Sequence, residues 1–243
     1  MRCSDISILC VAYAAAACEV VEDQPLANPV ARDLAAAKHR FDSCQTPFAR
    51  ASLYFDAMLS AASTMYKERR TNDKLGRCAR AYLEFVDEES TLQIAMMADA
   101  GDEHSMLLRI HDTEDFDLAS SSRQAVVFLQ RVHLLFEQEA CWSSGYTAHA
   151  LRLLSRPRVI FLDGIPKSIG GPRAVGPRLK SRCLDRMKQW VFLAKMTVQA
   201  EFPWAELMHA FSVFDLAPLA GRRRLTACDL GASANESALL TRF

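Results

Sequence analysis

Apolar residues recur at intervals of three and four along most of the chain, which is the spacing of amphipathic helices. The clearest stripe contains Val127, Leu129, Val132, Leu135 and Phe136. Prolines and capping residues mark where several of these stripes begin. The pattern predicts helices at about 29–41, 47–70, 73–86, 90–108, 121–139, 147–154, 177–200 and 203–216.

Local signals place the starts of four of these helices. Asn72 or Asp73 can cap the helix at 73–86, and Pro177 can occupy the first turn of the long helix at 177–200. Ser90-Thr91-Leu92-Gln93 and Ser121-Ser122-Arg123-Gln124 both fit a capping box, so a helix is expected to begin at each. Gly101 is expected to interrupt the first of these two helices.

One segment has the composition of a strand. Residues 158–165 are rich in β-branched and aromatic side chains and contain Asp163-Gly164, which favours a tight hairpin turn. The predicted fold class is therefore predominantly all-α, a compact multi-helix domain with one short β-hairpin near 158–169. We expect that helical domain at 29–216, an apolar segment at 1–28 and a loosely ordered tail at 217–243.

Composition narrows the class of protein. The chain has 243 residues, of which half are hydrophobic and about a quarter are charged, as in ordinary globular proteins. Nine glycines and nine prolines exclude collagen and disfavour an all-β chain with many tight turns. Because no apolar run reaches about 18 residues, no membrane span is predicted.

The N-terminus and the cysteines bear on the compartment. The eight cysteines have long, scattered spacings and form neither a CxxC pair nor a zinc-binding Cys/His set. Free, mostly buried thiols in an intracellular protein of the cytoplasm or nucleus are therefore expected. Residues 6–18 are apolar and end in small residues, so the chain is instead secreted if residues 1–18 act as a signal peptide.

Charge is balanced in total and uneven along the chain. Residues 1–120 carry 12 basic and 20 acidic side chains, whereas residues 121–243 carry 17 and 9. Three interpretations are open: the two halves face one another, each half forms a solvated face, or the basic stretch 156–188 binds the phosphates of a nucleic acid. The predicted phosphate-binding side chains are Arg156, Arg158, Lys167, Arg173, Arg178, Lys180, Arg182 and Arg186.

No segment carries a recognised catalytic motif. The glycine-rich loop at 170–176 fits neither dinucleotide nor P-loop spacing, and the acidic stretch 111–117 lacks the glycine and glutamate of a calcium loop. Glu206 and His209 lack the second such pair of a dimetal bundle, and Cys141 with His149 stands in no nucleophile motif. No catalytic, cofactor-binding or metal-binding residue is predicted, and no cofactor.

The sequence of residues 78–216 resembles the helical region of hAT-type transposase-like proteins. The resemblance rests on Leu83-Glu84-Phe85, 92–103, Gly145-Tyr146-Thr147, Gly170-Gly171-Pro172, 182–187, Glu201-Phe202-Pro203 and 211–216. It implies a largely helical insertion, in that family set within a ribonuclease-H-like core. This chain departs from the family in lacking the strands for that core and a zinc-finger set, so no catalytic residue is carried over.

Together these observations predict a non-enzymatic protein. The leading hypothesis is a helical protein–protein interaction module, a degenerate transposase-derived fragment that contacts a protein partner or its own copy. Any exposed part of the helices at 121–139 and 177–200 is the expected interface. The alternative hypothesis is a nucleic-acid-binding module that uses the basic stretch 156–188.

Overall fold

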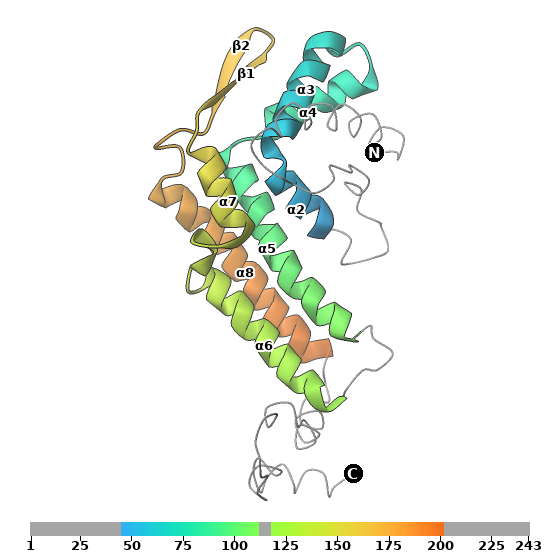
Figure 1. Cartoon of the computed structure of the whole chain (residues 1–243), viewed down its shortest axis with the longest axis vertical. Coiled ribbons are helices and arrows are strands. Elements are labelled where there is room, and N and C mark those ends of the chain that lie inside the picture. The colour runs from blue at the N-terminus through green and yellow to red at the C-terminus, as the bar shows by residue number, and fades with distance from the viewer. Residues whose placement is uncertain (1–44, 112–117, 202–243) are drawn as a thin grey trace, which may run out of the picture. The chain divides into compact units, whose positions relative to one another are not determined.

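The computed structural model of the chain describes residues 45–111 and 118–201 (Figure 1). These residues form helices and one antiparallel hairpin, so the predicted mostly helical class and the hairpin near 158–169 are confirmed. In chain order the elements are α2 (Gln45–Leu53), α3 (Phe55–Arg69), α4 (Lys74–Phe85), α5 (Glu88–His111), α6 (Leu118–Phe136), the 3₁₀ turn η4 (Ala140–Trp142), α7 (Gly145–Leu154), β1 (Arg158–Leu162), β2 (Ile165–Ile169) and α8 (Pro177–Glu201).

The described residues belong to two compact units. The first contains residues 45–102 and 139–187, and the second contains 103–111, 118–138 and 188–201. Helices α5 and α8 each contribute residues to both units. The predicted helices at 29–41 and 203–216 and the terminal segments 1–28 and 217–243 lie outside the described residues, so the expected division of the chain stays a prediction.

The starts of α4 and α5 are set by side-chain caps. Asp73 caps α4, as predicted, because its side chain accepts a 2.7 Å hydrogen bond from the amide of Gly76. The predicted start of a helix at Ser90 is wrong by one turn. Asp87 accepts from the Ser90 amide at 2.7 Å, and the Ser90 hydroxyl accepts from the Asp87 amide at 2.9 Å. This is a capping box in which Ser90 is the third helical residue and Asp87 the cap.

Two other expected boundaries are also corrected. Gly101 does not interrupt α5, which continues to His111; a side chain at Gly101 would meet Gln45 at 3.0 Å, so glycine here permits close approach of α2. Helix α6 begins at Leu118, so the sequence 121–124 lies inside the helix and does not cap it. A capping motif in the sequence shows neither which helices pack together nor whether the helix already begins before the motif.

The single helix predicted at 47–70 is two helices. Tyr54 separates α2 from α3, with a ψ of 27° that is not helical. The Ser52 hydroxyl donates a 2.9 Å hydrogen bond to the Phe48 carbonyl, a contact that bends helices in this way. Two backbone hydrogen bonds persist across the bend. The Tyr54 amide donates to the Arg50 carbonyl, and the Met58 amide donates to the Tyr54 carbonyl, both at 2.9 Å.

Each unit has its own buried apolar side chains. In the first unit Leu83, Leu92, Met96, Leu154 and Ile169 are fully buried. In the second unit the fully buried side chains include Phe136, Val132 and Val191, and the Phe136 ring meets Trp190 edge to face at 6.3 Å. None of the described helices is long and apolar enough to cross a membrane.

The hairpin is built as its sequence indicates. Strands β1 and β2 pair antiparallel, with Leu162 opposite Ile165 and Arg158 opposite Ile169. The turn residues Asp163 and Gly164 have φ values of 51° and 83°, and a type I′ turn requires positive φ at both positions. Asparagine, aspartate and glycine adopt this conformation most readily, which is why Asp-Gly predicted the hairpin.

Candidate protein-interaction site

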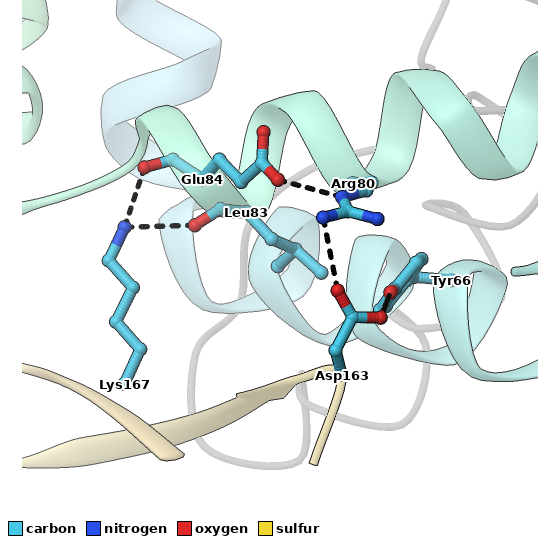
Figure 2. A network of polar contacts seen from close by, with 6 residues as sticks. All are labelled: Tyr66, Arg80, Leu83, Glu84, Asp163 and Lys167. Atoms are coloured by element: carbon cyan, nitrogen blue, oxygen red, sulfur yellow. Dashed lines mark hydrogen bonds and ion pairs between the residues drawn. The ribbon is translucent and has the colours of Figure 1, made fainter. Parts of the chain in front are cut away.

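The turn of the hairpin is attached to α3 and α4 by polar contacts. Figure 2 shows the Tyr66 hydroxyl donating to Asp163 and the Arg80 guanidinium reaching the other carboxylate oxygen of Asp163 at 3.0 Å. Arg80 also pairs with Glu84 along α4 at 2.7 Å. The tip of the hairpin is therefore held by two side chains from two different helices.

The middle of the hairpin is attached through the end of α4. The Lys167 ammonium, on β2, donates to the carbonyls of Leu83 and Glu84 at 2.9 and 2.8 Å (Figure 2). Carbonyls in the last turn of a helix have no partner within the helix and lie at the negative end of its dipole. A cation at this point stabilises both the helix end and the strand that carries it.

The base of the hairpin is attached to α3 and α7. Arg158 pairs with Asp56, with a 2.7 Å contact from Nη2 to Oδ2, and its Nη1 donates to the Leu153 carbonyl at 2.6 Å. Its guanidinium lies 5.5 Å from the ring centroid of Phe55. Arg158 is one of the predicted nucleic-acid-binding residues, and in the structure its guanidinium makes these contacts within the protein.

The glycine loop after β2 closes the base. The amide of Gly170 donates to the Glu88 carboxylate at 2.7 Å, and the amide of Gly171 donates to the Leu154 carbonyl at 2.8 Å. A phosphate-binding loop needs free amides of this kind. These two are engaged within the protein, which agrees with the expectation of a connecting loop at 170–176.

Anchoring leaves one face of the hairpin uncovered. Ile160 and Ile169 are buried on the inner side, whereas Val159 and Phe161 on the other side are 55% and 64% exposed. Pro166 lies opposite Phe161, and Ser168 lies opposite Val159; both are exposed. We call these four residues the outer hairpin face. The face is mainly apolar, and its backbone is fixed at the tip, middle and base.

Strand β2 limits how a partner can use this hairpin. Pro166 has no amide hydrogen, and proline in a strand is tolerated where its nitrogen faces away from the paired strand. A further strand added along the outer edge of β2 would lack that hydrogen bond. The outer hairpin face, and not the β2 edge, is therefore the surface available for packing.

Three basic residues of α8 also make contacts within the first unit. The Lys180 ammonium lies 4.8 Å from the ring centroid of Trp142. Arg182 and Arg186 both pair with Glu89, the latter at 2.8 Å. The partners precede these residues by about 40 to 100 positions, so the spacing of the basic residues could not reveal them.

The eight predicted nucleic-acid-binding residues thus divide into two groups. Five make the contacts above, including Arg158 and Lys167 in the hairpin. Arg156, Arg173 and Arg178 are exposed, and the structure records no ion pair for them within 45–111 and 118–201. Arg156 precedes β1 and Arg173 follows β2, so both flank the base of the hairpin.

The helices expected to form an interface do carry exposed apolar side chains. In the second unit Val126 and Leu134 of α6 are exposed, and Phe192, Leu193 and Met196 of α8 are 62%, 61% and 50% exposed. These residues are the exposed parts of the predicted helices at 121–139 and 177–200. Whether they form an interface stays a prediction.

The described cysteines are free and two of them are buried. Burial raises the pKa of Cys141 to about 12 and that of Cys183 to about 11, so both stay protonated at neutral pH. Cys78 is half-buried. No hydrogen bond between Cys141 and His149 is recorded in the described part of the chain. Burial also lowers the pKa of His149.

Other candidate chemistry has no support or falls outside the described residues. Within 45–111 and 118–201, no three His, Cys, Asp or Glu side chains are grouped to hold a metal ion. Residues 112–117 of the acidic stretch and the Glu206–His209 pair lie outside those ranges.

Sequence reasoning missed one buried polar centre. Asp99 of α5 accepts hydrogen bonds from the Tyr146 amide at 2.8 Å, the Thr147 amide at 3.0 Å and the Thr147 hydroxyl at 2.6 Å. Burial raises the pKa of Asp99, although these three hydrogen bonds act in the opposite direction. The available signal was a lone carboxylate within the alanine- and methionine-rich run 94–100.

Comparison with known proteins adds no family to this description. No family model, no curated protein and no solved structure matches the chain. The resemblance to hAT-type transposase-like proteins therefore rests only on the short sequence segments within residues 78–216.

Proposed function

We propose that this protein is a non-catalytic protein-interaction module and that a partner protein packs on its outer hairpin face. The observation that carries the proposal is the exposure of Val159 and Phe161 on a hairpin anchored at three levels. Large apolar side chains held on fixed backbone lose little conformational entropy when a partner covers them. Such side chains are the usual centre of a protein interface.

The charges around the hairpin specify the partner further. Arg156 and Arg173 flank its base and are exposed. An apolar partner surface with carboxylates at its border would match the apolar face and the two guanidinium groups together. The resemblance to transposase-like proteins is compatible with such a module, since it implies a helical fragment without transposition chemistry.

The experiment compares the full-length wild-type chain with Phe161→Asp and Val126→Asp. Proteins bound from a cell extract are quantified for all three chains, and the partner found is purified to measure its Kd directly. We expect Phe161→Asp to weaken binding at least tenfold, because a charge would be buried in an apolar contact. Val126→Asp places the same charge at an exposed apolar site in the other unit and is the matched control.

Three outcomes would contradict the proposal. Phe161→Asp binding as wild type does would exclude the outer hairpin face. Equal losses from both variants would mean that neither surface is specific. A wild-type dimer that Phe161→Asp dissociates would show that the face binds a second copy and not an acidic partner. Light scattering after size-exclusion chromatography measures that state.

A further inference from the structure

The pairing register determines which backbone groups of the hairpin point outward. Along an antiparallel pair, opposite residues alternately exchange two hydrogen bonds or none, and in a pair of the second kind both amides and carbonyls point away from the neighbouring strand. Leu162 and Ile165 flank the two-residue turn and form a pair of the first kind. The next pair, Phe161 with Pro166, is therefore of the second kind, the position that a proline tolerates because its nitrogen has no hydrogen to donate.

The outer edge of β1 keeps a complete set of these outward groups. Val159 lies two residues before Phe161, so each of them directs an amide and a carbonyl away from β2. Among the described residues, the structure records no hydrogen bond that occupies these four groups. We call them the β1 edge. On the outer edge of β2 Pro166 offers a carbonyl and no amide, so the β1 edge is the better template for a further strand.

The β1 edge adjoins the outer hairpin face. The side chains of Val159 and Phe161 are more than half exposed, and a strand added beside β1 would place alternate side chains next to them. Arg156 is exposed just before β1 begins. An antiparallel strand would run from the turn toward the base of the hairpin, so a carboxylate that follows its apolar residues would lie near this guanidinium.

We propose that the partner contributes an extended segment that pairs antiparallel with the β1 edge and makes the hairpin a three-stranded sheet. The segment has two apolar residues separated by one polar residue, and acidic residues follow them. Main-chain hydrogen bonds to Val159 and Phe161 supply affinity, and the apolar side chains packed beside these two residues supply specificity. This inference rests on the proposed function, because it specifies how the partner reaches the outer hairpin face.

A synthetic peptide tests the pairing on the full-length wild-type chain. The probe is fluorescein-labelled Thr-Val-Thr-Val-Thr-Glu-Glu, whose valines align with Val159 and Phe161, and its Kd is measured by fluorescence anisotropy. Methylation of both valine nitrogens removes the donors that face β1 and should weaken binding at least about tenfold. Methylation of the second and third threonine nitrogens removes two donors on the opposite edge of the peptide. This matched control should change the Kd by less than about twofold.

Two substitutions at one position test the same edge from the side of the protein. Val159→Pro removes an outward amide and should weaken the unmodified peptide at least about tenfold, whereas Val159→Ala keeps the amide and should weaken it less. Position 159 is of the same kind as that of Pro166, so proline there removes no hydrogen bond between β1 and β2. Urea denaturation shows whether each variant is folded; if Val159→Pro is not, the methylated peptides decide with the wild-type chain.

Three results would overturn this inference. They are a wild-type chain that does not bind the peptide, equal binding of the valine-methylated peptide, and equal losses from the two substitutions at Val159. Replacement of both glutamates by lysine should weaken binding, and an unchanged Kd would contradict the acidic part of the segment. Failure of the proposed function is a different result: there Phe161→Asp keeps the partner, whereas a failure of strand pairing alone leaves the partner sensitive to Phe161→Asp.

Discussion

Asp99 caps the N-terminus of α7, a role that a residue next to the helix usually has. Ser144 stands at the cap position of α7, yet its side chain makes no capping bond. The carboxylate that binds the first amides comes instead from α5, more than 40 residues earlier in the chain. Asp99 is only 6% exposed, so its three hydrogen bonds fix α7 on α5 in a place where water cannot replace them.

Asp99→Asn is expected to destabilise the protein. An amide has a donor where the carboxylate had a second acceptor, so at least one buried donor near Tyr146 or Thr147 loses its partner. The free energy of unfolding should fall by about 1–3 kcal/mol, measured by urea denaturation at pH 7. The exposed substitution Asp185→Asn on α8 is the control and should change it by less than about 0.5 kcal/mol.

The pH dependence of this difference has a definite sign. Burial holds the pKa of Asp99 above its usual value of 3.8, so the folded chain binds the proton more tightly than the unfolded chain. The stability of wild type relative to Asp99→Asn should therefore fall as the pH rises from below 3.8 through the folded pKa. A difference that grows with pH would show that the hydrogen bonds outweigh burial.

At the scale of elements, the hairpin depends on its attachments. A two-stranded hairpin is marginally stable alone, and this one is held by Tyr66 and Arg80 at Asp163 and by α4 at Lys167. Asp163 combines two roles, because it accepts those contacts and also adopts the positive φ of the turn. Two substitutions at this one position can separate the roles.

Asp163→Asn should be mild and Asp163→Ala more harmful. Asparagine keeps the backbone preference for the turn and loses only a half-exposed ion pair, so the free energy of unfolding should fall by less than about 1 kcal/mol. Alanine loses the side-chain contacts and is strained at a φ of 51°, so the loss should reach about 2 kcal/mol. Urea denaturation of both full-length chains compares them; equal losses would mean that the turn conformation is unimportant.

Local signals predicted the elements well and their contacts poorly. Asp73, Pro177 and Asp163-Gly164 act within a few residues of themselves, so the starts of α4 and α8 and the hairpin turn could be predicted. The bend at Tyr54 and the cap of Asp99 on α7 depend on which helices meet. The same holds for the outer hairpin face, since alternation along β1 cannot show which side α3 and α4 cover.

At the scale of the molecule, part of the uneven charge along the chain is explained by ion pairs between its two halves. Acidic residues of the first half pair with basic residues of the second in three places within the first unit. Asp56 pairs with Arg158, and Glu89 pairs with Arg182 and Arg186. These contacts support the interpretation that the two halves of the sequence pair with each other. They also reduce the number of basic side chains available for phosphates.

The nucleic-acid alternative can be tested on the side chains left exposed. We expect wild type to elute from a size-exclusion column without excess absorbance at 260 nm at both low and high salt. An excess that disappears at high salt would contradict this, because phosphate contacts weaken steeply with salt. Arg173→Glu with Arg178→Glu should then abolish it, whereas Lys188→Glu, one of the exposed charges of α8 outside the predicted set, serves as the control.

Pro166 has a consequence for the protein at high concentration. A chain that displays valine and phenylalanine on an uncovered strand risks open-ended stacking of like strands, copy upon copy, as in cross-β fibres. Each step of such growth needs an unbroken row of amide donors, and Pro166 removes one from the edge of β2. Pro166 therefore opposes open-ended pairing of β2 edges between copies of the chain, while the outer hairpin face stays exposed.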